Sequence, residues 1–259
     1  METCKGVKAR GKAYFLSDLH LGARYFASRI EAERRVVAFL DSIAGSASEI
    51  YLLGDVLDYW FEYRYVVPRG HVRFFGKLAE LADRGVKITW MICNHDIWIF
   101  DYIPSELGVE VIDGALEREI LGKRFFLAHG DGLGKRTPVF KAMRAIFRNR
   151  VCQKLYSGIH PRWTIPFALG WSRSSRKAGA DERAEAEGRT GAESLLDFAE
   201  SHHRSHPEID FYIFGHVHFQ ARRELPGGGA ALTLGGWIST FDYAEFDGNE
   251  LKVSAWGGR

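Results

Sequence analysis

Five polar fragments, each directly after a short run of apolar residues, limit the possible folds of this chain more than any other feature. The apolar runs have the length and composition of buried strands. Each run is followed by an aspartate, an asparagine or a histidine: Asp18, Asp55, Asn94, His129 and His216. In an open α/β sheet, ligands bind in the crevice beyond the carboxyl ends of the strands. We therefore expect strands that are remote in the sequence to bring these side chains to one place.

The first half of the chain alternates predicted strands with predicted helices. Residues 14–17, 50–53 and 86–92 are predicted strands, and apolar residues recur at helical spacing within residues 28–44 and 71–84. This β-α-β-α-β order favours an α/β fold with a mostly parallel sheet covered by helices.

Further strands are predicted in the second half. Leu116–Ile120 and residues 124–128 form a hairpin-like pair, and Phe211–Phe214 is another short apolar run. Residues 230–256 alternate short apolar runs with glycine-rich turns, which indicates a β-meander. We expect this meander to form a second sheet.

The segment between these strands, residues 133–207, is predicted to be a helical insertion into a core made of residues 1–132 and 208–259. Residues 138–156 are predicted to form one amphipathic helix. Another helix is expected to run from about residue 181 to about residue 205. Three histidines near its end are predicted to lie on the surface: His202, His203 and His206.

The polar fragments together supply a mixed nitrogen and oxygen ligand set, which suits Mn²⁺, Zn²⁺ or Fe²⁺ better than Mg²⁺ or Ca²⁺. Seven candidate ligands are too many for one tetrahedral site but enough for two sites that share a bridge: Asp18, His20, Asp55, Asn94, His129, His216 and His218. Because a carboxylate can bridge two ions, Asp55 is the predicted bridging ligand. Two such ions make water available as a nucleophile near neutral pH and stabilise the oxygens of a phosphoryl group.

Two residues beside Asn94 complete the predicted catalytic set. His95 is placed to protonate the leaving oxygen or to stabilise charge on the phosphoryl group. Asp96 is predicted to orient His95 as a carboxylate behind it. Each fragment alone has an ordinary explanation, since Gly-Asp is usually a turn and Asn-His-Asp a polar loop. Their occurrence together after strand-like runs is what favours a metal site.

The fragments as a set resemble the signature of calcineurin-like metallophosphoesterases. They are Asp18-x-His20, Gly54-Asp55, Asn94-His95-Asp96, His129-Gly130-Asp131 and Gly215-His216-x-His218. The resemblance implies a sandwich of two mixed β-sheets flanked by helices. It also implies one metal held by Asp18, His20, Asp55 and His218, and a second metal held by Asp55, Asn94, His129 and His216.

The runs at residues 17–22, 52–60 and 128–133 further resemble UDP-2,3-diacylglucosamine hydrolases of lipid A biosynthesis. That resemblance implies hydrolysis of the diphosphate of a UDP-linked diacyl glucosamine to UMP and a lipid sugar 1-phosphate. It also implies Mn²⁺ as the metal, and a helical lid over the acyl chains.

This chain departs from that subfamily at several positions. The best-known members have Arg where this chain has His95, Gly where it has Cys93 and Tyr at the position of Phe140. In the lid run, residues 175–179, only Ser175 and Ala178 match. The predicted substrate-binding residues are Phe140, Arg144, Arg148, Ser175, Arg176 and Lys177. Cys93 is expected to be a small buried residue and not a ligand.

The charge pattern of the insertion supports a lipid-linked substrate and an anionic membrane surface as partners. Residues 133–180 contain eleven Lys and Arg, no Asp or Glu, and many aromatic residues. A helical hairpin packed on the core with a solvated basic face would have the same pattern. Basic residues interleaved with aromatics also occur in nucleic-acid-binding proteins, but we predict no nucleic-acid partner.

Composition agrees with a globular protein, with 46% hydrophobic and 26% charged residues and a net charge of +2. The three cysteines form no C-x-x-C pair, which fits a reducing compartment. No apolar run approaches the ~18–20 residues needed to span a bilayer, and residues 1–12 lack the apolar core of a secretory signal. We expect a cytoplasmic location, peripheral to the inner membrane.

Two other functions remain open from the sequence. The chain could be a phosphodiesterase or phosphomonoesterase that acts on soluble nucleotides. It could also be a non-catalytic scaffold, but the presence of all seven candidate ligands favours an enzyme.

Overall fold

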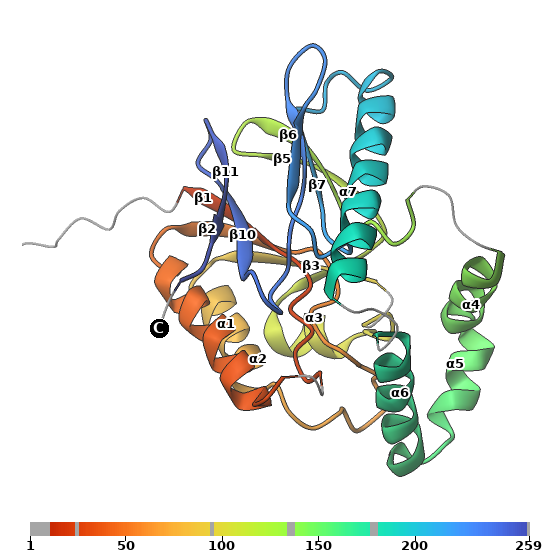
Figure 1. Cartoon of the computed structure of the whole chain (residues 1–259). Helices are drawn as coiled ribbons and strands as arrows, with labels where there is room; N and C mark the ends of the chain where they lie inside the picture. Colours follow the sequence, from red (N-terminus) through yellow and green to blue (C-terminus); the bar gives the residue numbers. More distant parts are fainter. Residues whose placement is uncertain (1–10, 24–25, 94–95, 134–137, 177–180, 258–259) are drawn as a thin grey trace, which may run out of the picture.

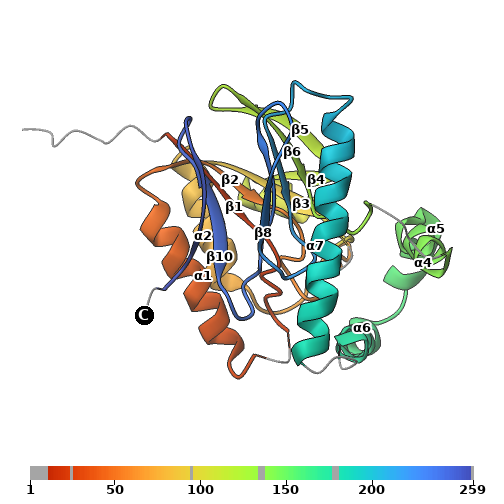
Figure 2. The same cartoon turned by 45° about the horizontal axis from the view of Figure 1, so that its top comes forward.

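Two β-sheets pack face to face in the computed structural model, with helices on both outer faces (Figures 1 and 2). The structure describes residues 11–23, 26–93, 96–133, 138–176 and 181–257. The predicted α/β sandwich of two mixed sheets is confirmed.

The first sheet has six strands in the order β11-β10-β1-β2-β3-β4. Strands β1 to β4 pair in parallel, β10 pairs antiparallel with β1, and β11 pairs antiparallel with β10 at the edge. Their bounds are β1 (Lys12–Leu16), β2 (Ala47–Leu52), β3 (Lys87–Ile92), β4 (Glu110–Asp113), β10 (Asp242–Phe246) and β11 (Leu251–Ala255). Three helices connect the parallel strands: α1 (Arg29–Ile43), α2 (Val72–Asp83) and α3 (Tyr102–Leu107).

The second sheet has five strands in the order β5-β6-β7-β9-β8. Its central strands β6, β7 and β9 are parallel, whereas β5 and β8 lie antiparallel at the two edges. Their bounds are β5 (Leu116–Ile120), β6 (Lys123–Ala128), β7 (Phe211–Phe214), β8 (Ala221–Glu224) and β9 (Ala230–Thr233).

The alternation of side chains along the strands produces three layers of core. In β1, Ala13 and Phe15 face the second sheet, and Tyr14 and Leu16 face α1 and α2. Phe15 stacks on Phe125 of β6 between the two sheets, with ring centroids 5.5 Å apart. A third cluster lies between the outer face of the second sheet and α7 (Asp181–His203).

Helices α4 (Pro138–Arg148), α5 (Arg150–Ser157) and α6 (Pro161–Arg176) lie to one side of the sheets (Figures 1 and 2). By contrast, the carboxyl half of α7 packs on the second sheet through Leu195, Leu196 and Ala199. Within the predicted insertion, helices α4 to α6 therefore lie apart from the sheets, whereas α7 packs on one of them.

Several predicted elements differ from the structure. The single helix predicted for residues 138–156 is wrong, because Asn149 adopts an extended backbone and its side chain caps α5 by accepting hydrogen bonds from Val151 and Cys152. The strands β10 and β11 complete the first sheet, so the prediction that residues 230–256 form the second sheet is correct only for β9.

The sequence also missed α3, β4 and β8, all of which have six residues or fewer. The prediction of three surface histidines at the end of α7 is wrong for His203, which is buried. His202 packs on Phe126 and its Nδ1 lies 3.1 Å from the hydroxyl of Tyr212. None of the described helices has the length and apolar character needed to cross a membrane.

Candidate metal centre

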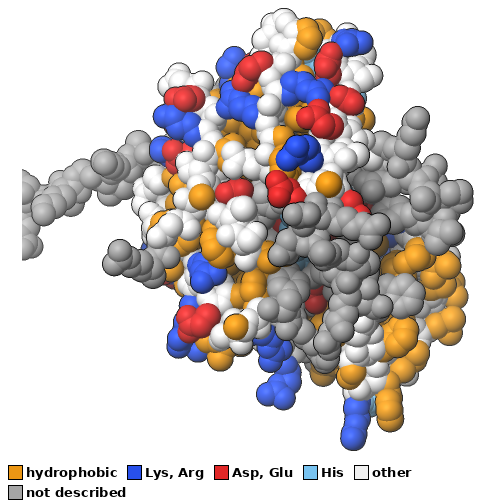
Figure 3. Space-filling model, in the orientation of Figure 1, with side chains coloured by type: hydrophobic (Ala, Val, Ile, Leu, Met, Phe, Trp, Pro, Cys, Tyr) orange, Lys and Arg blue, Asp and Glu red, His pale blue; other side chains and the backbone are white. Residues whose placement is uncertain are grey.

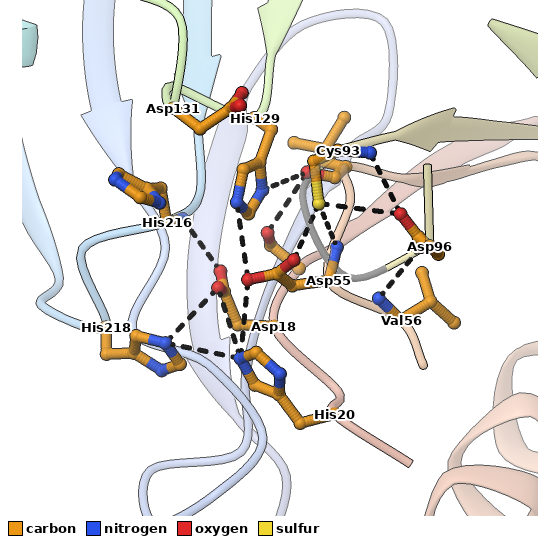
Figure 4. Close-up of polar contacts among 12 residues, drawn as sticks. Asp18, His20, Asp55, Val56, Cys93, Asp96, His129, Asp131, His216 and His218 are labelled. Carbon is orange, nitrogen blue, oxygen red and sulfur yellow. Dashed lines mark hydrogen bonds and ion pairs between the residues drawn. The ribbon is translucent and has the colours of Figure 1, made fainter. Parts of the chain in front are cut away.

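The loops that follow β1 and β2 meet the loops that follow β6 and β7 at one edge of the sandwich (Figure 4). Backbone hydrogen bonds continue beyond the strands and align these loops. The amide of Asp18 donates to the carbonyl of Gly54 at 3.1 Å, and the amide of His20 donates to the carbonyl of Asp55 at 2.9 Å. The amide of Gly215 likewise donates to the carbonyl of His129 at 3.0 Å. Main-chain geometry thus places the side chains before any metal binds.

One group of possible ligands consists of Asp18, His20 and His218. The Nε2 atoms of the two histidines are 3.3 Å apart, and their rings stack with centroids 5.1 Å apart. Oδ1 of Asp18 lies 3.4 Å from Nε2 of His218 and 3.7 Å from Nε2 of His20. The second oxygen of Asp18, Oδ2, accepts a hydrogen bond of 2.9 Å from the amide of His216.

A second group contains Asp55 and His129, together with Cys93. Oδ2 of Asp55 lies 3.6 Å from Nε2 of His20 and 3.5 Å from Nε2 of His129. The same carboxylate oxygen therefore faces both groups, as a bridging ligand must. The ring of His216 lies against that of His129, with centroids 5.1 Å apart.

Two buried ligand atoms have no hydrogen-bond partner among the described residues. They are Oδ1 of Asp18 and Nε2 of His129. A buried polar atom without a partner costs free energy, on the order of 1–3 kcal/mol. Both atoms point into the space shared by the carboxylates and imidazoles, so these donors fit divalent ions at that place (Figure 4).

Strained backbone is concentrated in the same residues. Eight non-glycine residues of the described chain have positive φ angles, and five of them are predicted ligands: Asp18, His20, Asp55, His216 and His218. Such conformations cost roughly 1–3 kcal/mol each and persist where the surroundings enforce them. The strain therefore marks these loops as shaped for a ligand.

Burial and charge set the protonation of the cluster. Burial lowers the pKa of His129, but Asp55 and other carboxylates outweigh it and raise the pKa to about 10. Burial raises the pKa of Asp18, but the nearby imidazoles of His218 and His20 outweigh that effect and hold the pKa below its usual range. The carboxylates and imidazoles of the centre therefore stabilise each other's charged forms.

Glycines beside the ligands allow the loops to approach closely. A Cβ atom at Gly215 would lie 1.8 Å from Oγ of Ser17 and 2.8 Å from Oδ2 of Asp18. A Cβ atom at Gly54, whose φ is +92°, would lie 2.7 Å from Nδ1 of His129. No other residue type fits at these positions without moving a predicted ligand.

Six of the seven predicted ligands are described, and the structure brings all six together: Asp18, His20, Asp55, His129, His216 and His218. Asn94 and His95 lie outside the described residues. Asp96 is fully buried, and its carboxylate accepts hydrogen bonds from the amides of Cys93 and Val56 and from the indole of Trp90. Its predicted effect on His95 stays a prediction.

The sequence prediction left out two residues that border the centre. Cys93 is buried as expected, but its thiol contacts Asp55. Asp131 is also buried, and its Oδ2 has no hydrogen-bond partner among the described residues. Asp131 belongs to the His129-Gly130-Asp131 fragment, so its position in that motif was a usable signal.

Two predicted substrate-binding arginines of α4 are described. Nη1 of Arg144 lies 3.6 Å from Oδ2 of Asp131, at the border of the centre. Arg148 pairs with Asp113 at the end of β4. The other four predicted positions lie outside the described side chains: Phe140, Ser175, Arg176 and Lys177.

A family model decides the relationship of this chain to known proteins. The model for calcineurin-like phosphoesterases matches residues 11–220, which include all seven predicted ligands. The chain belongs to this family. As a calcineurin-like phosphoesterase it is a metal-dependent hydrolase, and the carboxylates and imidazoles described above fit divalent metal ions.

Curated relatives cover almost the whole phosphoesterase. A UDP-2,3-diacylglucosamine hydrolase of Porphyromonas gingivalis is 44% identical over 95% of this chain and 98% of its own length. Proteins of the same name from Ralstonia nicotianae and Stenotrophomonas maltophilia are 28% and 27% identical, over 95% and 94% of this chain and 91% and 95% of their own lengths.

Proposed function

We propose that this phosphoesterase hydrolyses the diphosphate of a UDP-linked diacyl glucosamine and releases UMP and a lipid sugar 1-phosphate. The proposal of hydrolysis at a two-metal centre rests on the position of Asp55 Oδ2, which lies between His20 and His129 as a bridging ligand would. The substrate rests on the 44% identity with a UDP-2,3-diacylglucosamine hydrolase along nearly the whole chain.

The proposed centre holds two divalent ions, with Mn²⁺ as the expected metal. Asp18, His20 and His218 would hold one ion and His129, His216 and Asn94 the other, and Asp55 would belong to both. When bound, such a pair supplies Lewis acidity to the phosphoryl oxygens and lowers the pKa of water.

The protein's own groups would orient the substrate and move protons. His95 is proposed to donate a proton to the leaving phosphate oxygen, and Asp96, which accepts hydrogen bonds from the amides of Cys93 and Val56, is proposed to orient it. Arg144 extends from α4 to Asp131 at the border of the centre, so its guanidinium is proposed to bind the diphosphate.

Helices α4 to α6 are proposed to form the lid over the acyl chains and the contact with an anionic membrane. They expose large apolar side chains along one side of the molecule (Figure 3): Ile146, Val151, Leu155, Ile159, Trp163 and Phe167. Side-chain hydrogen bonds connect α5 and α6 to the core, among them those of Tyr59 with Tyr156 and of Tyr63 with Thr164. These apolar side chains belong to a segment, residues 133–180, that has eleven basic and no acidic residues, and this combination suits an anionic lipid surface.

The test is hydrolysis of UDP-2,3-diacylglucosamine by the purified protein with Mn²⁺, measured as release of UMP. Asn94→Ala and His129→Ala should each lower turnover by at least about 100-fold, because each removes a ligand of the proposed centre. His206→Ala is the matched control, since this histidine follows α7 and lies outside both the centre and the proposed lid. Rapid turnover of soluble nucleotides with an inert diacyl substrate would overturn the substrate assignment. Unchanged turnover in both ligand variants would overturn the centre.

A further inference from the structure

Cys93 makes contacts that none of the roles above requires. It follows β3 directly and is 1% exposed. Its Sγ lies 2.6 Å from Oδ1 of Asp55 and 3.5 Å from Oδ1 of Asp96, and it accepts a hydrogen bond of 2.8 Å from the amide of Asp55. A bare sulfur and a carboxylate oxygen would repel at such a distance, so the contact with Asp55 is an S–H···O hydrogen bond.

The two oxygens of Asp55 therefore have different surroundings. Oδ1 is held by the thiol of Cys93, whereas Oδ2 faces Nε2 of His20 and Nε2 of His129. In Figure 4, Cys93 lies toward the Asp96 side of Asp55, with the histidines on the other side. The thiol thus fixes the rotation of the carboxylate and leaves one oxygen directed at both halves of the centre.

Asp96 in turn fixes the end of β3 from which Cys93 projects. Its Oδ1 accepts the amide of Cys93 at 2.9 Å. Its Oδ2 accepts the indole Nε1–H of Trp90 at 2.9 Å and the amide of Val56 at 3.3 Å. Because Val56 follows Asp55, this one carboxylate links the loop after β2 to the loop after β3.

We propose that Cys93 is a positioning residue that orients Asp55 as the bridging ligand of the two-metal centre. The proposal rests on the proposed function only through the presence of a metal pair, and it does not depend on the identity of the substrate. A glycine at this position would have no side-chain donor. The thiol of Cys93 therefore gives Asp55 a hydrogen bond that a glycine could not.

The test compares Mn²⁺ binding to metal-free protein in three variants by calorimetric titration. Cys93→Ala removes the donor, Cys93→Ser keeps a hydroxyl donor, and Cys152→Ala is the control because Cys152 is exposed on α5. Loss of a hydrogen bond that supports a metal ligand typically weakens metal binding about 10- to 100-fold. We expect this loss in Cys93→Ala, recovery of most of the affinity in Cys93→Ser, and no change in Cys152→Ala.

Electron paramagnetic resonance supplies a readout that looser packing alone would not change. Two Mn²⁺ ions that share a carboxylate are spin-coupled, so the wild-type protein and Cys93→Ser should give a coupled spectrum. Cys93→Ala at the same Mn²⁺ loading should give a larger fraction of uncoupled Mn²⁺. Thermal unfolding of each metal-free variant checks that it is folded.

Several results would overturn the proposal. The first is equal Mn²⁺ affinity in wild type and Cys93→Ala, and the second is failure of Cys93→Ser to recover affinity. A third is a sulfur-to-metal charge-transfer band in the Co²⁺-loaded wild type that Cys93→Ser lacks, because the sulfur would then be a ligand itself. Binding of fewer than two ions by the wild type would overturn both this proposal and the proposed centre. If the Mn²⁺ titrations give the expected results but the protein does not hydrolyse the diacyl substrate, only the proposed substrate is overturned.

Discussion

Replacement of Gly54 by alanine tests whether backbone geometry places the metal ligands. Gly54 has a φ of +92°, and a Cβ atom there would lie 2.7 Å from Nδ1 of His129 and 3.0 Å from Sγ of Cys93. Nδ1 of His129 lies 2.8 Å from the carbonyl oxygen of Leu53, so this contact would be broken if the ring moves. The substitution therefore disturbs both the loop and a predicted ligand.

The expected loss of stability follows from these two effects. A non-glycine residue forced into such a conformation costs roughly 1–3 kcal/mol, and a lost hydrogen bond about 1 kcal/mol. Gly54→Ala should thus lower the free energy of unfolding of the metal-free protein by about 2–4 kcal/mol. It should also weaken Mn²⁺ binding, because His129 cannot keep its position.

The assay is urea denaturation of metal-free protein, followed by Mn²⁺ titration of the folded variant. Gly76→Ala is the matched control, because a Cβ atom at this helical position in α2 meets nothing within 4 Å. It should raise stability by up to about 1 kcal/mol. If Gly54→Ala is as stable as the wild type and binds Mn²⁺ equally well, the argument from backbone geometry is wrong.

Three further predictions concern other parts of the chain. Burial lowers the pKa of His71 to about 4. Between pH 4 and 6.5 the unfolded state binds more protons, so stability should fall as the pH drops through this range, by about 3 kcal/mol in total. In denaturation at several pH values, His71→Asn should remove that part of the slope, and an unchanged slope in this variant would contradict the role of burial. Glu33 accepts hydrogen bonds from the amides of Arg73 and Phe74 at the start of α2. Glu33→Ala should destabilise by about 2–3 kcal/mol in urea, and Glu33→Gln by less, because the amide oxygen still accepts. Trp163→Ser with Phe167→Ser should reduce sedimentation with anionic vesicles while hydrolysis of a small chromogenic phosphodiester stays unchanged. Equal loss of both would mean that α6 supports the fold and not lipid binding.

The strands of the first sheet show what local pattern can and cannot predict. β1, β2 and β3 were recognisable because each is a short apolar run that ends in a ligand-type residue, and parallel order followed from the helices between them. β10 has equally clear alternation, with residues in turn buried and partly exposed. Alternation identifies the buried face of a strand but not its partner, so it could not show that β10 pairs with β1.

In the predicted insertion, too, the sequence pattern predicted some features and missed others. Apolar spacing in residues 138–156 predicted helix correctly, but the break at Asn149 depends on its side chain capping α5 and was not visible in the periodicity. His203 was expected at the surface because it lies near the end of the predicted helix, just before the next strand. Its burial follows from the packing of α7 on the second sheet, which only the tertiary structure decides.

The metal centre was predictable from the sequence because its residue types follow strand ends, and strand ends of one sheet meet at one edge. The predicted ligand set, the predicted role of Asp55 as the bridge and the phosphoesterase chemistry came from that pattern and from a family resemblance. The tertiary structure alone decided which oxygen of Asp55 faces His20 and His129, and that the thiol of Cys93 holds the other. The physical reason is that residue type determines which ligand atoms are present. The rotation of each carboxylate is set by hydrogen bonds from residues distant in the chain, such as Cys93, which is 38 positions from Asp55.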